Sequence, residues 1–173
     1  MFFSLSKLVN RLKSELQAPE TVQILSDISL EFLAQDTQDT DFFAQILSEF
    51  VVPGTVIALN GTLGAGKTRF VQAFAATQGI SPEDVTSPTF VLIQEYRNGK
   101  IPIFHFDAYR LADEDEFLQL GPEEYFDADG ISFVEWADRV KTCLPENRFE
   151  IFIEHVGTTQ RKFTLRIPEN SEF

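Results

Sequence analysis

The chain has 173 residues, a length typical of one domain, and 43% of them are hydrophobic, which is enough for a single core. Its 27 acidic and 14 basic residues give a net charge of −13, which argues against strong direct binding to the phosphate backbones of nucleic acids. The single cysteine excludes an intrachain disulfide, and no apolar run approaches the roughly 20 residues of a membrane span.

The first predicted element is an amphipathic helix over residues 4–17, which Pro19 would end. Its apolar residues at helical spacing are Leu5, Leu8, Val9, Leu12 and Leu16. Only three cations accompany them, so packing on the domain or on a partner is a better interpretation than binding to a membrane surface. We therefore predict a helical N-terminal extension over residues 1–25 and the folded domain over residues 26–173.

Strand-like and helix-like segments alternate through the remainder of the chain. The predicted strands span residues 28–33, 55–59, 90–96, 101–106, 131–136, 149–155 and 163–167. The predicted helices span residues 39–50, 70–75 and 113–120. Asn98 and Gly99, between two apolar runs, predict a hairpin turn. This order predicts a single α/β domain with a mixed, parallel-rich sheet flanked by helices.

Residues 61–68 read Gly-Thr-Leu-Gly-Ala-Gly-Lys-Thr and fit the phosphate-binding pattern G-x-x-x-x-G-K-[ST]. A predicted strand precedes them and a predicted helix follows, which is the context of this loop in the P-loop NTPase fold. The backbone N–H groups would bind the phosphates of a nucleoside triphosphate, Lys67 would reach the β- and γ-phosphates, and the Thr68 hydroxyl would ligate Mg²⁺. The residues expected to contact the nucleotide here are Thr62, Leu63, Gly64, Ala65, Gly66, Lys67, Thr68 and Arg69.

Two acidic residues that follow apolar strands are candidates for the second Mg²⁺ anchor of such a site. Asp107 follows residues 101–106, and Glu135 follows residues 131–134. If both strands run parallel to the strand before the glycines, the two carboxylates lie at the sheet edge where ligands bind. Either of them could touch the metal directly, and the alternative for each is a surface acid in a loop. His105 is more typical of a strand residue with a satisfied ring than of a base.

Ser87 and Thr89 lie between the predicted helix and the predicted hairpin. Hydroxyl residues there can fold over a γ-phosphate, as the switch loops of GTPases do, although a Ser-Pro turn leading into a strand is the plainer interpretation. Arg110 and Arg139 could stabilise charge at the γ-phosphate or form structural salt bridges, and for Arg139 we favour a salt bridge. Trp136 fits either the core or a stacking position near the nucleotide.

Several of these motifs occur in the order found in one protein family. They are Leu63-Gly64-Ala65-Gly66-Lys67-Thr68, Ser87-Pro88-Thr89-Phe90, His105-Phe106-Asp107-Ala108-Tyr109-Arg110-Leu111 and Val134-Glu135-Trp136. Over about residues 28–167 the chain resembles the TsaE family, the ATPase component of the bacterial machinery that makes threonylcarbamoyladenosine in tRNA. The resemblance implies a P-loop fold and a weak Mg²⁺-dependent ATPase. It would work with the two other subunits of the modifying complex, and ATP would reset that complex between rounds.

The resemblance also implies roles for the candidate site residues. Lys67, Asp107 and Glu135 would be the catalytic residues. Thr68 and Glu135 would hold Mg²⁺, with Asp107 as a further acidic residue of the metal and water network.

Other residues would complete the binding site for ATP. Ser87 and Thr89 would belong to the switch loop, and Thr37 would lie near the adenine. The sequence departs from the family pattern at Thr62, where Asp is usual, and at Arg69, where a second Thr is frequent. Neither departure removes a ligand of the phosphates or of the metal.

A small-molecule kinase is the main alternative function. A kinase lid usually carries several arginines, whereas residues 107–139 hold eleven acidic residues and two arginines. A GTPase-like switch would need a guanine-recognition segment of the Asn-Lys-x-Asp type, and the sequence has none. We expect an accessory ATPase that acts through its partner subunits, without strong tRNA binding and without membrane association. The single cysteine and the lack of a secretory signal pattern predict a cytoplasmic protein.

Overall fold

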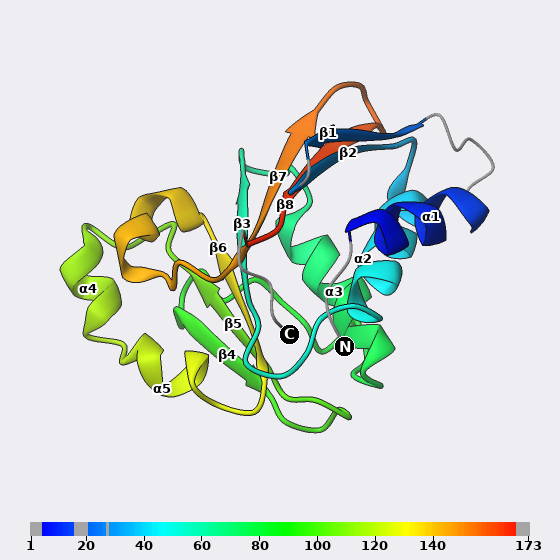
Figure 1. The fold of residues 1–173 in the computed structure, drawn as a ribbon. Helices are drawn as coiled ribbons and strands as arrows, with labels where there is room; N and C mark the ends of the chain where they lie inside the picture. The colour runs from blue at the N-terminus through cyan, green and yellow to red at the C-terminus, as the bar shows by residue number, and fades with distance from the viewer. Residues whose placement is uncertain (1–4, 16–20, 27, 169–173) are drawn as a thin grey trace.

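The computed structural model describes residues 5–15, 21–26 and 28–168. Within these residues one sheet of eight strands forms the centre of the molecule, in the order β1-β2-β8-β7-β3-β6-β5-β4 (Figure 1). The strands are β1 (Val22–Ser26), β2 (Ser29–Ala34), β3 (Val56–Gly61), β4 (Ile93–Tyr96), β5 (Ile103–Asp107), β6 (Ile131–Glu135), β7 (Phe149–His155) and β8 (Arg161–Arg166). The helical segments are α1 (Leu5–Glu15), α2 (Thr37–Ser48), α3 (Lys67–Thr77), α4 (Glu114–Leu118), α5 (Pro122–Phe126) and the 3₁₀ segment η2 (Ala137–Cys143).

Parallel pairing is confined to the middle of the sheet. β3 pairs in parallel with β6 and β7, and β5 pairs in parallel with β6. Antiparallel strands extend the sheet on both sides: β4 pairs with β5, while β8, β2 and β1 follow β7 in turn. The single α/β domain with a mixed sheet that the sequence predicts is thus confirmed. The described sheet is not parallel-rich, because four of its strand pairs are antiparallel and three are parallel. Because β3, β5 and β6 are parallel, their carboxyl ends meet at one edge of the sheet.

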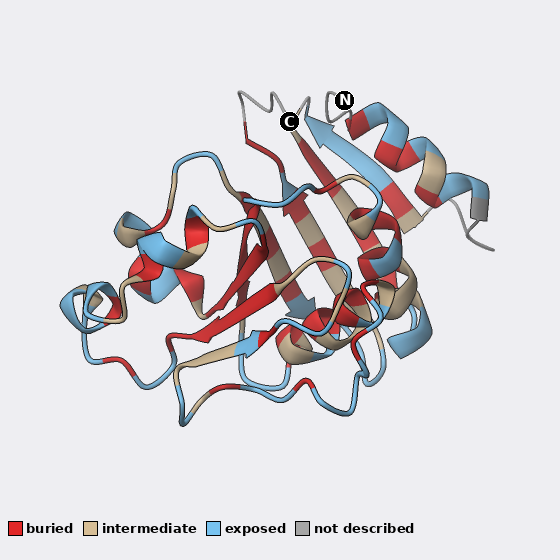
Figure 2. Ribbon diagram, turned by 90° about the horizontal axis from the view of Figure 1, so that it is seen from below, coloured by how far each residue is buried: buried red, intermediate tan, exposed pale blue. Residues whose placement is uncertain are grey.

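Helices cover both faces of the sheet because successive strand residues point to opposite sides. Ile57 and Leu59 of β3 belong to a large apolar cluster with α1, α2 and α3, whereas Val56 and Ala58 belong to a smaller cluster with α4, α5 and η2. Figure 2 shows buried segments along the central strands and exposed segments on the outer turns of the helices. The alternating burial therefore accounts for two helical layers around one sheet.

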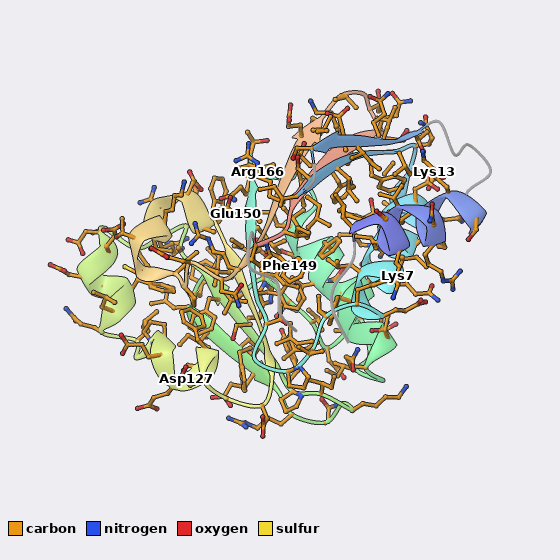
Figure 3. The ribbon with its side chains drawn as sticks, viewed as in Figure 1. Lys7, Lys13, Asp127, Phe149, Glu150 and Arg166 are labelled. Atoms are coloured by element: carbon orange, nitrogen blue, oxygen red, sulfur yellow. The ribbon has the colours of Figure 1, made fainter. Side chains whose placement is uncertain are left out.

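Phenylalanine side chains fill much of the larger cluster. The ring centroid of Phe43 in α2 lies 5.2 Å from that of Phe32 and 5.3 Å from that of Phe163. Figure 3 shows side chains filling the space between the sheet and the helices, and Phe149 at the start of β7 is fully buried there. This packing accounts for many of the 18 phenylalanines, an unusually high number for this chain length.

The N-terminal helix predicted over residues 4–17 is present as α1, although Leu16 and Pro19 lie outside the described residues. The buried face of α1, which includes Leu8, belongs to the same apolar cluster as the sheet. β1 was not predicted, and it pairs with β2 at the edge of the sheet. The boundary predicted after residue 25 therefore falls inside a strand of the sheet.

The predicted hairpin is present, but its first strand is shorter than expected. β4 begins at Ile93 rather than at residue 90 and pairs antiparallel with β5. Before it, Leu92 has a φ of 68°, and its N–H donates to Pro88 O at 2.6 Å. The chain turns here before it extends, so Phe90 and Val91 are exposed.

The helix predicted over residues 113–120 is also shorter, and a second helix follows it. Asp113 caps α4 by accepting the N–H of Glu116 at 3.0 Å, and the helix ends at Leu118. Gly121 then adopts a φ of 66°, which starts α5 in a new direction. In the part of the chain that the structure describes, no helix is long and apolar enough to cross a bilayer.

Candidate nucleotide site

The glycine loop, residues 61–68, joins the end of β3 to the start of α3. Gly61, Gly64 and Gly66 have φ values of 154°, 75° and 111°, which residues with a Cβ rarely adopt. A Cβ on Gly61 would lie 2.6 Å from Ile153 O of the neighbouring β7. The loop therefore needs glycine to pass this close to the sheet. The N-terminus of an eleven-residue helix, a favourable position for an anion, adjoins it.

Lys67 is the first residue of α3, and its side chain folds back over the glycine loop. Only 4% of Lys67 is exposed, and its Nζ donates to Gly61 O at 2.8 Å and to Thr62 O at 3.0 Å. The same nitrogen lies 3.9 Å from the ring centroid of Trp136. Burial lowers the pKa of Lys67, and the neighbouring carboxylates, Glu135 first among them, oppose that shift. An ammonium group is thus held at the place where a phosphate tail would be expected.

Thr68 and Glu135 meet across the sheet edge although 67 residues separate them. The Thr68 hydroxyl donates to Glu135 Oε1 at 2.7 Å. Glu135 is the last residue of β6, lies opposite Leu59 of β3, and is 3% exposed. The hydroxyl at the start of α3 is therefore in direct contact with the buried carboxylate at the end of β6.

Asp107 lies beside Glu135 because β5 and β6 are in register at these two residues. Its Oδ2 accepts hydrogen bonds from Ser87 Oγ at 2.8 Å and from Thr89 Oγ1 at 2.6 Å. Its Oδ1 accepts the N–H of Tyr109 at 2.9 Å. The buried carboxylate therefore fastens the segment that carries both candidate switch-loop hydroxyls to the sheet edge.

The two arginines near the carboxylates make contacts that the sequence did not predict. Arg110 lies over the exposed ring of Phe90, with its Cζ 4.3 Å from the ring centroid. Arg139 donates to the carbonyls of Ala108 and Leu111 at 3.1 and 2.7 Å, so it holds a backbone turn rather than the salt bridge that we favoured.

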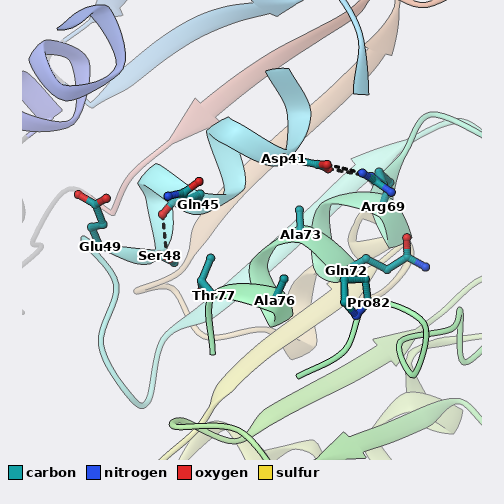
Figure 4. Close-up of a pocket in the computed structure, with 10 residues that line it drawn as sticks. All are labelled: Asp41, Gln45, Ser48, Glu49, Arg69, Gln72, Ala73, Ala76, Thr77 and Pro82. Atoms are coloured by element: carbon teal, nitrogen blue, oxygen red, sulfur yellow. Dashed lines mark hydrogen bonds and ion pairs between the residues drawn. The ribbon is translucent and has the colours of Figure 1, made fainter. Parts of the chain in front are cut away.

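Arg69 follows Thr68 in α3, and its side chain reaches α2. Its guanidinium pairs with Asp41 of α2 through two hydrogen bonds (Figure 4). Both residues line a hollow of about 530 Å³ between α2 and α3. Of the predicted site residues only Arg69 lines this hollow, so it is not the expected nucleotide site.

Thr37 lies at the first position of α2, after the N-cap residue Asp36. Residues close to Thr37 in the sheet connect it to the glycine loop. Ala34 at the end of β2 is opposite Arg161 in β8, and Arg161 Nε donates to Ala65 O at 3.1 Å. The structure thus connects the Thr37 region to the loop through a contact that the sequence did not reveal.

Two residues outside the predicted site set, His105 and Trp136, lie in the centre of the site. His105 is fully buried, and its Nε2 lies 2.9 Å from Glu135 Oε1. Trp136 contacts Lys67 as described, and its ring centroid lies 4.9 Å from that of Tyr109. One signal was available for His105: strand alternation places it on the same side as Asp107, two residues later.

The donor set of this site fits Mg²⁺. Among residues 5–15, 21–26 and 28–168, no group of three or more His, Cys, Asp or Glu side chains is placed to hold a metal by itself. Mg²⁺ does not require such a cage, because it commonly takes one or two protein oxygens and completes its shell with phosphates and water. The Thr68 hydroxyl and the Glu135 carboxylate are oxygen donors of this kind.

Comparisons with known proteins agree with the geometry. Residues 34–163 match the family model described as threonylcarbamoyl adenosine biosynthesis protein TsaE. A TsaE protein of Bacillus subtilis is 41% identical over 136 residues, covering 79% of this chain and 84% of the relative. A TsaE protein of Treponema pallidum is 35% identical over 133 residues, covering 77% and 97%.

A solved structure gives the same result at the level of the fold. The crystal structure of YdiB from Bacillus subtilis superposes with a TM-score of 0.69 at 35% identity, covering 82% of this chain and 87% of that one. The family match spans most of the sheet and all the residues that converge at its edge. The chain therefore belongs to the TsaE family.

Proposed function

We propose that this protein is an ATP-binding and ATP-hydrolysing accessory subunit of the complex that makes threonylcarbamoyladenosine in tRNA. It acts through the two other subunits of that complex and resets the modification cycle. The observation that carries the proposal is the hydrogen bond of 2.7 Å between the Thr68 hydroxyl, at the end of the glycine loop, and the Glu135 carboxylate. Membership of the TsaE family supplies the pathway.

The glycine loop provides the binding site for the triphosphate in a P-loop fold. Its three left-handed glycines allow backbone N–H groups to gather around an anion, and the N-terminus of α3 adds a favourable dipole. Lys67 is already held at this loop by two carbonyls, so its ammonium needs only a local movement to reach a phosphate. These residues bind and orient the phosphate tail.

Thr68 and Glu135 hold Mg²⁺, and Asp107 belongs to the surrounding network of metal and water. Bound Mg²⁺ neutralises charge on the β- and γ-phosphates during hydrolysis. Asp107 anchors Ser87 and Thr89 and so keeps the switch-loop segment beside the carboxylates. Hydrolysis is expected to be weak, because the two nearby arginines are engaged by an aromatic ring and by backbone carbonyls.

The acidic surface is consistent with a role among proteins rather than on tRNA itself. α4 and α5 carry acidic residues in their first turns, and the whole chain has a net charge of −13. Such a surface repels tRNA and favours a basic protein partner. Sub-micromolar binding of tRNA by the purified protein at moderate salt would contradict this part of the proposal.

Two substitutions test the site directly. Lys67→Ala should lose most of its affinity for ATP, because it removes a buried charge from the phosphates, at a cost of roughly 2–5 kcal/mol. Glu135→Ala should chiefly impair Mg²⁺-dependent hydrolysis. Lys100→Ala and Glu123→Ala change exposed residues of the same types and should behave as the parent protein. Normal ATP binding and hydrolysis by both site variants would refute the assignment.

Comparing nucleotides and acceptors separates the alternatives. Preference for ATP over GTP distinguishes the proposed ATPase from a GTPase-like switch. A small-molecule kinase would transfer the γ-phosphate to an acceptor other than water, and it would require arginines over the phosphates. Release of the γ-phosphate only as inorganic phosphate, together with ADP, supports the ATPase.

A further inference from the structure

His105 is a buried polar residue for which the proposed function has no use so far. It lies in β5 on the side of Ile103 and Asp107, facing the large apolar cluster, and none of it is exposed. Its Nε2 lies 2.9 Å from Glu135 Oε1, the oxygen that also accepts the Thr68 hydroxyl. Its Nδ1 is buried without a hydrogen-bond partner.

A purely structural role explains this arrangement poorly. Ile103, which lies on the same side of β5, and the register partner Phe133 in β6 are apolar and fully buried. An apolar side chain at position 105 would fill the same space without leaving a buried nitrogen unpaired. The one polar contact of the ring that compensates for this cost is the hydrogen bond to Glu135.

We propose that His105 is a positioning residue that presets the Glu135 carboxylate for the divalent ion, an inference that rests on the proposed function. The carboxylate is an acceptor, so the ring nitrogen facing it, Nε2, carries the proton. With Thr68 and His105 both donating to Oε1, the carboxylate is fixed in rotation, and its second oxygen is left for other ligands. Hydrogen-bonding partners of this kind raise the metal affinity of the ligands that they orient.

The binding of metal-free nucleotide and the binding of Mg²⁺ should depend on His105 to different extents. The phosphate cradle depends on Lys67 and the glycine loop, which hydrogen-bond to each other, whereas His105 hydrogen-bonds to Glu135. Loss of the His105 hydrogen bond should therefore weaken Mg²⁺ binding without changing the binding of metal-free nucleotide. A general loss of packing would weaken both.

The experiment uses the fluorescence of Trp136, the single tryptophan, which touches Lys67 and so reports events at the loop. ATP affinity is measured first in EDTA, and Mg²⁺ is then titrated at saturating ATP. His105→Leu removes the hydrogen-bond donor and keeps the position apolar. His105→Gln keeps an N–H at a similar reach. Ser132→Ala, at a buried position of β6 away from the carboxylate, is the control for disturbance of the sheet.

His105→Leu should require about 10- to 100-fold more Mg²⁺ for half-saturation, with unchanged ATP affinity in EDTA. His105→Gln should recover most of the loss, and Ser132→Ala should match the parent. If His105→Leu does not fold, His105→Asn replaces it, because its amide is too short to reach Glu135. Parental Mg²⁺ dependence in His105→Leu, or equal losses in Leu and Gln variants, would overturn the inference. A parent protein that binds no ATP with Mg²⁺ would instead refute the proposed function.

Discussion

The structure predicts that Gly61→Ala, at the first residue of the glycine loop, destabilises the protein. An added Cβ would lie 2.6 Å from Ile153 O and 3.1 Å from Ala65 Cβ, whereas ordinary contacts begin near 3.4 Å. The first of these atoms is backbone of β7, which is hydrogen-bonded to β3 and cannot rotate away. The end of β3 would therefore have to separate from β7 at the point where the loop begins.

Two costs add in this variant. Overpacking against a fixed backbone costs about 1–3 kcal/mol, and forcing a residue with a Cβ to a φ of 154° costs about 1–3 kcal/mol more. We expect a loss of about 2–6 kcal/mol in the free energy of unfolding. For a domain of this size the corresponding drop in Tm is roughly 4–24 °C.

Urea unfolding of the nucleotide-free protein measures this loss, with Gly64→Ala as the matched control. Gly64 also has a positive φ, of 75°, but a Cβ there would meet no atom within 4 Å. Its substitution should therefore cost only the backbone strain, about 1–2 kcal/mol. Equal destabilisation by the two variants would show that the contact with Ile153 does not constrain the loop and would refute the reasoning.

Two further predictions follow from the burial of a lysine and of a helix. Burial lowers the pKa of Lys67 in the free protein, whereas a bound triphosphate favours its charged form, so binding takes up a proton above that lowered pKa. ATP affinity should therefore fall as the pH rises above the lowered pKa of Lys67. In Lys67→Arg, whose side chain stays protonated, ATP affinity should depend less on pH, whatever its absolute value. Leu8→Ala in α1 should destabilise the whole domain by about 2–5 kcal/mol in urea unfolding, whereas Lys13→Ala on the exposed side should change it by less than about 0.5 kcal/mol. A small effect of Leu8→Ala would favour an independent extension over residues 1–25.

The features that the sequence predicted correctly are those that nearby residues determine. The glycine loop needs particular φ values at particular positions, and only glycine supplies them, so the pattern is visible in eight consecutive residues. The apolar runs before Asp107 and Glu135 likewise identify buried strands. Both carboxylates could therefore be placed at strand ends before the structure was known.

The features that the sequence missed depend on contacts between distant segments. β1 reads Val-Gln-Ile-Leu-Ser, in which Val22 alone is buried, so it lacks the alternation of a half-buried strand and forms by pairing with β2. The sequence did not predict that the side chain of Arg69 pairs with Asp41, 28 residues earlier. The partner of a long charged side chain depends on helix packing, which periodicity does not reveal.

The convergence of the site depends on strand register more than on any single residue. The sequence predicts both carboxylates at one edge of the sheet if β5 and β6 run parallel to β3. In the structure β6 pairs in parallel with both β3 and β5. Asp107 is opposite Glu135, which is opposite Leu59, so one register brings both acids to the loop. A slip of β6 by one residue would turn Glu135 to the other face of the sheet. The apolar packing of Phe133 and Ile131 on the α3 side, which opposes such a slip, therefore also protects the contact between Glu135 and Thr68.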